Sequence, residues 1–213
     1  MSDSQIFSSS AYWDTRYRAG GASGAGSLGR LARFKAGVIN RFIQDNHIGS
    51  VIDLGCGDGS QLALLDLPRD YVGVDVAPAA LARCAARFPN RLFVPYEIVG
   101  SLPRAELTLS LDVIYHLVED TVFAETMRWL FGLATRFVVI YASNVDADSP
   151  APHVRHRTFT RHVAETQPEW RLLAHVINPC PYDPNRPDDT SFADFFIYGR
   201  SNAACTLHMP GSD

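Results

Sequence analysis

The most constraining feature of the sequence is the run VIDLGCGDG at residues 51–59. An apolar pair ends in the carboxylate of Asp53, and glycines then alternate with other residues, at Gly55, Gly57 and Gly59. Apolar residues followed by such glycines predict a buried strand that enters a tight turn, where a ligand can approach the backbone closely. The run therefore predicts a ligand site at the end of a buried strand.

The carboxylates of Asp53 and Asp58 indicate which ligand this turn can accept. A dinucleotide pyrophosphate favours backbone N–H groups and a helix N-terminus, and neighbouring carboxylates would repel its negative charge. S-adenosylmethionine carries an ammonium and a sulfonium, so its positive charges fit the two carboxylates better. The alternative is that the glycines form only a tight turn and that the carboxylates cap a helix.

Strands and helices alternate along most of the chain. Apolar runs predict seven strands, at residues 51–54, 71–76, 91–94, 107–111, 137–141, 172–177 and 192–198. Helical patterns cover residues 28–46, 78–88, 121–133 and 158–165, and a further helix is expected to begin at Gln61. This alternation predicts one α/β domain over residues 29–200, with a Rossmann-like, mostly parallel sheet and helices on both faces. The long loop 178–190 permits an antiparallel last strand.

Three blocks, VIDLGCGDG, YVGVDV and LSLDVIYHLVED, occur in this order, each at the C-terminal end of an expected strand. Together they resemble the class I S-adenosylmethionine-dependent methyltransferases over residues 29–200, and more loosely the bacterial small-molecule and envelope-sugar enzymes among them. The resemblance implies that Asp75 binds the ribose and that the adenine lies near Tyr96 or Glu97. The full set of cofactor residues that it implies is Arg16, Tyr17, Asp53, Gly55, Cys56, Gly57, Asp75, Val76, Leu111 and Asp112.

Two other functions remain as alternatives. A nicotinamide-dependent oxidoreductase would share the first strand and turn, but Ser60 occupies the third glycine position of the dinucleotide pattern. The chain also has no Tyr-x-x-x-Lys pair, and Lys35 is its only lysine. A non-catalytic binding module of the same fold would bind the cofactor weakly or not at all.

Residues 1–28 are rich in glycine and serine but contain the aromatic and basic cluster YWDTRYR at residues 12–18. N-terminal segments in the resembled superfamily often fold over the cofactor as a lid. Arg16 could then pair with the cofactor carboxylate, while Tyr12 or Tyr17 shields the methyl group from water. The alternative is a disordered N-terminus, and the polar residues 201–213 are expected to form a flexible tail.

His116 is the candidate catalytic residue, because it follows the fourth expected strand and an imidazole can remove a proton near neutral pH. It could instead be a packing residue. His153, Arg155 and Arg157 would share one side of an extended segment and could bind an anionic group of the acceptor, or could be solvated charges. Tyr12 and Asn144 are further candidate substrate residues.

The composition limits the classes of partner that we expect for this chain. The formal net charge of −4 gives no support for a nucleic-acid partner. The sequence has no apolar run long enough for a bilayer and no secretory start, so we expect a cytoplasmic protein with no membrane partner. The four cysteines are far apart and predict no metal site. We expect a monomer or homodimer that methylates a small, anionic or carbohydrate-like acceptor.

Overall fold

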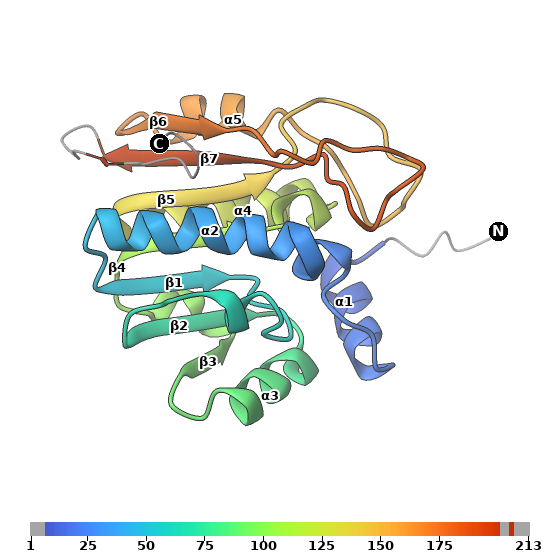
Figure 1. The fold of residues 1–213 in the computed structure, drawn as a ribbon, viewed down its shortest axis with the longest axis horizontal. Helices are drawn as coiled ribbons and strands as arrows, with labels where there is room; N and C mark the ends of the chain where they lie inside the picture. The colour runs from blue at the N-terminus through green and yellow to red at the C-terminus, as the bar shows by residue number, and fades with distance from the viewer. Residues whose placement is uncertain (1–6, 201–204, 207–213) are drawn as a thin grey trace.

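The computed structural model describes residues 7–200 and 205–206, in which a seven-stranded sheet has the order β3-β2-β1-β4-β5-β7-β6 (Figure 1). Strand β7 is antiparallel to both of its neighbours, and the other neighbouring pairs are parallel. The expected fold class, a Rossmann-like sheet with an antiparallel last strand, is therefore confirmed. The strands are β1 (Ser50–Leu54), β2 (Asp70–Asp75), β3 (Leu92–Pro95), β4 (Ala105–Leu111), β5 (Ala134–Ala142), β6 (Trp170–Val176) and β7 (Asp194–Arg200).

Helices cover both faces of the sheet, as expected. Helix α2 crosses the near face in Figure 1, while α4 lies behind the sheet. Strand β5 shows why both faces are apolar: Phe137 and Val139 pack into the cluster with α2, whereas Val138 and Ile140 pack into the cluster with α4. The helices are α1 (Ser9–Arg18), α2 (Gly29–Asp45), α3 (Pro78–Arg87), α4 (Asp120–Gly132) and α5 (Phe159–Thr166).

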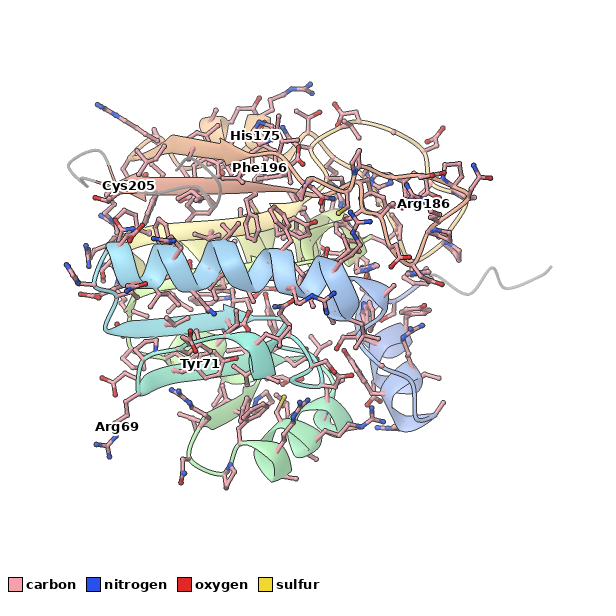
Figure 2. The ribbon with its side chains drawn as sticks, viewed as in Figure 1. Arg69, Tyr71, His175, Arg186, Phe196 and Cys205 are labelled. Carbon is pink, nitrogen blue, oxygen red and sulfur yellow. The ribbon has the colours of Figure 1, made fainter. Side chains whose placement is uncertain are left out.

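The antiparallel strand β7 lies inside the sheet, and β6 forms the edge. Two residues labelled in Figure 2 illustrate how β6 is held: the rings of His175 and Phe196 stack with their centroids 4.5 Å apart. His175 Nε2 also lies 2.9 Å from a carboxylate oxygen of Asp194 on β7. The loop that connects these strands therefore carries the chain back between β5 and β6.

Two local features of the structure differ from the predictions. The helix expected from Gln61 is wrong, because only a short 3-10 turn forms there, η2 (Leu62–Leu64). The side chain of Asn40 in α2 pairs with the carbonyl of Leu64 and the N–H of Asp66, and Pro68 follows, so the backbone leaves the helical path. Helix α1 was not expected; Ser8 caps it by accepting a 3.3 Å hydrogen bond from the N–H of Ala11.

The tail expected at residues 201–213 lies mostly outside the described residues. Where it is described, Thr206 N donates to the side-chain oxygen of Asn46 at 3.0 Å, and Thr206 O accepts from the amide of Asn46 at 2.7 Å. This pair of hydrogen bonds holds that point of the chain against the end of α2. Over the described residues, no helix combines the length and the hydropathy that crossing a bilayer requires.

Candidate functional site

The glycine turn lies at the carboxyl end of β1, as predicted, and its backbone has left-handed conformations. Gly55, Gly57 and Gly59 have φ values of 91°, 60° and 78°. At Gly57 a side chain is excluded twice over, since a Cβ would also lie 2.4 Å from the hydroxyl oxygen of Ser23. The glycine therefore allows the N-terminal part of the chain to rest directly on the turn.

Asp75 ends β2 and is fixed by backbone donors. One of its oxygens accepts from the N–H of Gly57 at 2.9 Å, and the other accepts from the N–H of Ala77 at 2.9 Å. Burial raises the pKa of Asp75, although these N–H groups act in the opposite direction. The carboxylate is therefore oriented before any ligand binds, with lone pairs left over for ligand hydroxyls.

Asp53 is the more perturbed carboxylate. It is 5% exposed, and its best partner is the hydroxyl of Tyr71, which donates at 3.1 Å. Tyr71 comes from the neighbouring strand β2 and is labelled in Figure 2. Burial raises the pKa of Asp53 to about 7, against the lowering effect of the Tyr71 hydrogen bond. A buried carboxylate of this kind is stabilised in its charged form by a cationic ligand.

Asp58, the other acidic residue of the turn, points elsewhere. It accepts from the N–H of Ser60 at 3.0 Å and from the N–H of Ser23 at 3.1 Å. Burial alone would raise the pKa of Asp58, but these hydrogen bonds outweigh it and lower the pKa. Asp58 therefore holds the N-terminal part of the chain and is not among the residues that line the cavity described below.

Residues 9–27, which we call the strap, are fastened at their start and near their middle. At the start of α1, both oxygens of Glu119 accept hydrogen bonds from Ser9, from its N–H at 2.8 Å and from its hydroxyl at 2.5 Å. Near the middle of the strap, the guanidinium of Arg83 donates at 2.6 Å to the carbonyls of Tyr17 and Gly21. In Figure 1, α1 stands beside the edge toward which β1 points.

A cavity of about 320 Å³ lies between the strap and the carboxyl ends of β1, β2 and β4. Ten of the residues expected to bind cofactor or catalyse line it: Tyr17, Asp53, Gly55, Cys56, Gly57, Asp75, Val76, Leu111, Asp112 and His116. Tyr96 and Glu97, expected near an adenine, also line it. The expected residues that do not line it are Arg16, Tyr12, Asn144, His153, Arg155 and Arg157.

Arg16 is engaged within the strap itself. Its Nε donates to the carbonyl of Ala22 at 2.8 Å, and its guanidinium carbon lies 5.7 Å from the centre of the Trp13 ring. Of the described cationic side chains, Lys35 does line the cavity, although the sequence pattern had not indicated it as a site residue. A signal was available, since Lys35 follows Leu31 by four residues and precedes Val38 by three, on the buried side of α2.

Lys35 and Asp112 form an ion pair at the wall of the cavity. Asp112 follows β4 with a backbone φ of 61°, a conformation that residues other than glycine rarely adopt. Its N–H donates to the carbonyl of Tyr141 at 2.9 Å, and one carboxylate oxygen accepts from the hydroxyl of Tyr115 at 2.8 Å. These contacts hold a strained backbone in place, which is typical of a functional site.

His116 lines the same cavity and is held from one side. Its Nδ1 lies 2.8 Å from the carbonyl oxygen of His153, so this nitrogen carries the proton and Nε2 keeps a free lone pair. Trp13 packs edge-on against the ring, with the centroids 4.9 Å apart. Burial lowers the pKa of His116 to about 4, although its hydrogen bond to the carbonyl of His153 acts in the opposite direction. The imidazole is therefore neutral at physiological pH.

The basic run after β5 does not form the expected one-sided anion site. The ring of His153 stacks on Tyr12, with the centroids 4.6 Å apart. Arg155 and Arg157 instead turn toward α4, and each places a guanidinium nitrogen 3.1 Å from a carboxylate oxygen of Asp120. Arg155 and Arg157 therefore share Asp120 as a partner, whereas His153 faces Tyr12.

Arg157 and Asn144 have structural partners. Arg157 donates to the carbonyls of Leu117 and Val118, at 2.8 and 2.9 Å. The side-chain oxygen of Asn144 accepts from the N–H and the hydroxyl of Thr160 at 3.1 Å, within the first turn of α5. These contacts place both residues outside the cavity.

No metal centre is evident, since the part of the chain that the structure describes has no group of three or more histidine, cysteine, aspartate or glutamate side chains arranged to hold an ion. Among the described residues that line the cavity, the charged ones are mostly acidic: Asp53, Asp75, Glu97, Asp112 and Glu125 face the single cation of Lys35.

Neither the family models nor the curated proteins give a match to this sequence. Solved structures do match. Magnesium protoporphyrin IX methyltransferase from Synechocystis PCC 6803 with bound SAM is 14% identical, with a TM-score of 0.65 over 92% of this chain and 99% of that one. The methyltransferase domain of bacterial CtHen1-C is 18% identical, with a TM-score of 0.62 over 82% of this chain and 100% of that one.

The N-methyltransferase NodS from Bradyrhizobium japonicum WM9 is 12% identical, with a TM-score of 0.60 over 76% of this chain and 92% of that one. The first of these proteins is named for magnesium protoporphyrin IX and the third for N-methylation, so the likeness does not choose an acceptor. What they share is the architecture, and this chain has the class I methyltransferase fold.

Proposed function

We propose that the protein is an S-adenosylmethionine-dependent methyltransferase that acts on a small-molecule acceptor. The observation that carries the proposal is the carboxylate of Asp75, held by the N–H groups of Gly57 and Ala77 in an acidic cavity at the carboxyl ends of parallel strands. This edge is where ligands bind in open α/β sheets. The oriented carboxylate can accept hydrogen bonds from two ribose hydroxyls.

The residues of the cavity fit this cofactor better than a dinucleotide. Asp53, Asp75 and Asp112 would favour an ammonium and a sulfonium and repel a pyrophosphate. The side-chain oxygen of Gln61 is buried at the cavity and has no hydrogen-bond partner among the described residues, so it can accept from a cationic N–H donor. When bound, S-adenosylmethionine supplies an electrophilic methyl group on its sulfonium.

The strap supplies the exclusion of water that methyl transfer needs. Trp13 and Tyr17 line the cavity from the strap side, and the hydroxyl of Tyr17 lies 2.8 Å from that of Ser23. Closing the site over the reacting atoms prevents competition by water and strengthens the electrostatic interactions inside. The strap therefore has the role expected of an N-terminal lid, and this role is part of the proposal.

His116 is proposed to orient the acceptor and take up its proton late in the reaction. A base with a pKa of about 4 is too weak to ionise a hydroxyl at neutral pH. However, a hydroxyl oxygen that has received a methyl group becomes a protonated ether, which is a much stronger acid than an imidazolium. The unprotonated Nε2 can therefore receive that proton without any earlier ionisation of the acceptor.

A carbohydrate-like or other small acceptor remains the proposal, but an anionic group on it has no support from Arg155 and Arg157. Both guanidiniums are already paired with Asp120 and with backbone carbonyls. The neutral His116 adds no positive charge on the acceptor side. An uncharged acceptor hydroxyl or amine is consequently the better match.

Calorimetric titration tests the proposal. S-adenosylhomocysteine should bind the wild-type protein, while NAD should not. Asp75→Ala should weaken S-adenosylhomocysteine by about 100-fold, because two charge-assisted hydrogen bonds and the pre-oriented turn are lost. Asp70→Ala, at the exposed beginning of the same strand, is the matched control and should bind as the wild type does. Binding of NAD without S-adenosylhomocysteine would overturn the proposal in favour of an oxidoreductase.

A further inference from the structure

The side chain of Lys35 is unusual because it is the only lysine of the sequence and is 1% exposed. It extends from α2 to the cavity wall, where its ammonium pairs with Asp112 and lies 5.4 Å from the centre of the Tyr141 ring. Burying an ammonium is costly unless its charge and its N–H donors are matched. A lysine in this position therefore calls for a specific partner beyond ordinary packing.

Counting donors and acceptors leaves capacity toward the cavity. An ammonium has three N–H donors. Within the described residues Lys35 has one carboxylate acceptor, Asp112, and one ring face, Tyr141. The opposite oxygen of Asp112 accepts from the hydroxyl of Tyr115, and a carboxylate can accept further bonds. Both members of the ion pair can consequently contact a ligand without losing each other.

The charge distribution indicates which ligand group belongs beside Lys35. Of the described residues that line the cavity, five are carboxylates and Lys35 is the only permanently charged cation. Arg16, the residue expected to bind a ligand carboxylate, donates to the carbonyl of Ala22 and does not line the cavity. Lys35 is therefore the one cationic side chain of the described lining that can stabilise a negative group in this cavity.

We propose that Lys35 and Asp112 together recognise the zwitterionic amino-acid group of the cofactor, with Lys35 binding its carboxylate and Asp112 its ammonium. This inference rests on the proposed function. An ion pair at the wall of a cavity presents a positive and a negative site side by side, which complements a ligand that carries both charges on one carbon. Lys35 is thus a specificity-determining residue, and it takes the role that the sequence suggested for Arg16.

Three ligands of decreasing charge separate the two contributions. S-adenosylhomocysteine carries the whole zwitterion, its decarboxylated analogue S-adenosyl-3-thiopropylamine keeps only the ammonium, and methylthioadenosine has neither charge. In wild-type protein, calorimetry should give about 10- to 100-fold weaker binding after loss of the carboxylate. In Lys35→Met, S-adenosylhomocysteine should weaken by a similar factor, so that it and its decarboxylated analogue bind almost equally.

The second member of the pair has its own signature. Asp112→Asn should weaken S-adenosylhomocysteine and the decarboxylated analogue together, while methylthioadenosine changes little. Arg33→Met, an exposed change on the same helix, is the matched control and should leave all three affinities as in the wild type. Methylthioadenosine binding also reports whether each variant still has a folded site.

The outcomes distinguish a failure of the proposed function from a failure of the role assigned to Lys35. If wild-type protein binds none of the three ligands, the proposed function itself fails. If it binds S-adenosylhomocysteine and its decarboxylated analogue equally, or if Lys35→Met still discriminates between them, only the role of Lys35 is overturned. Should Lys35→Met lose its fold, Lys35→Gln retains an N–H donor without the charge, and the same comparison of ligands in that variant and in wild type decides.

Discussion

The two sides of the cavity use charged residues in opposite ways. On the side of β1 and β2, Asp53 and Asp75 are buried and face the cavity. Asp53 accepts one hydrogen bond from a hydroxyl, and Asp75 accepts two from backbone N–H groups. On the side of the loop after β5, Arg155 and Arg157 bind Asp120 and backbone carbonyls, and they do not line the cavity. Charge in the sequence therefore marks a ligand site only where the fold turns the charged group toward the cavity and leaves part of its hydrogen-bonding capacity open.

The largest expected effect concerns Asp53, on the first side. Its pKa in the folded, ligand-free protein is about 7, above its ordinary value, so the folded protein binds more protons than the unfolded chain between about pH 4 and 7. The free energy of unfolding should accordingly fall as the pH rises through that window, by up to about 4 kcal/mol from this one group.

Asp53→Asn sharpens this prediction by removing the titration. In urea unfolding, the free energy of unfolding should fall less between pH 5 and pH 8 for the variant than for wild type. The variant should also be the more stable of the two proteins at pH 8. The same variant should bind S-adenosylhomocysteine more weakly than wild type, since the cationic ammonium loses a carboxylate. If Asp53→Asn were destabilising at pH 8 and bound the ligand normally, Asp53 would be a structural residue like those on the opposite side.

The second prediction compares Arg157 with Arg155. The two arginines are separated by a single residue in the sequence but have different surroundings. The Arg157 side chain is 14% exposed and the Arg155 side chain 46% exposed, although both reach Asp120. Arg157 also lies over the ring of Phe123, with its guanidinium carbon 4.6 Å from the ring centre. Its hydrogen bonds should therefore contribute more to stability.

Arg157→Ala should lower the free energy of unfolding by about 2 kcal/mol, because the carbonyls of Leu117 and Val118 lose a charged donor. Arg155→Ala should lower it by less than about 1 kcal/mol, as is typical of an exposed ion pair. Urea titration of the two variants measures this difference. Equal and negligible losses would mean that the guanidiniums are available to a ligand after all, which would restore the anion site.

The sequence predicted the sheet well because the central strands β1, β4, β5 and β7 are short apolar runs that are mostly buried, and such a run can be recognised without long-range information. It also selected Asp53 and Asp75, whose positions follow directly from the ends of β1 and β2. The helix expected from Gln61 did not form, since its outcome depended on Asn40, which is distant in sequence. The partners of Arg155 and Arg157 were equally non-local, and so was the closeness of Lys35 to Asp112.

His116 lies where the two sides of the cavity meet. The effect predicted for it is the smallest of the three, because it concerns only the protonation state of one ring. Its hydrogen bond to the carbonyl of His153 and its pKa of about 4 predict a neutral ring protonated on Nδ1 over the physiological range. Nitrogen-15 NMR of the imidazole, assigned with His116→Gln, should give an unprotonated Nε2 at pH 7 and no titration until the pH approaches 4. A titration near 6.5 would contradict this assignment. The ring would then be an ordinary base able to carry positive charge beside the acceptor, and the preference for an uncharged acceptor would lose its support.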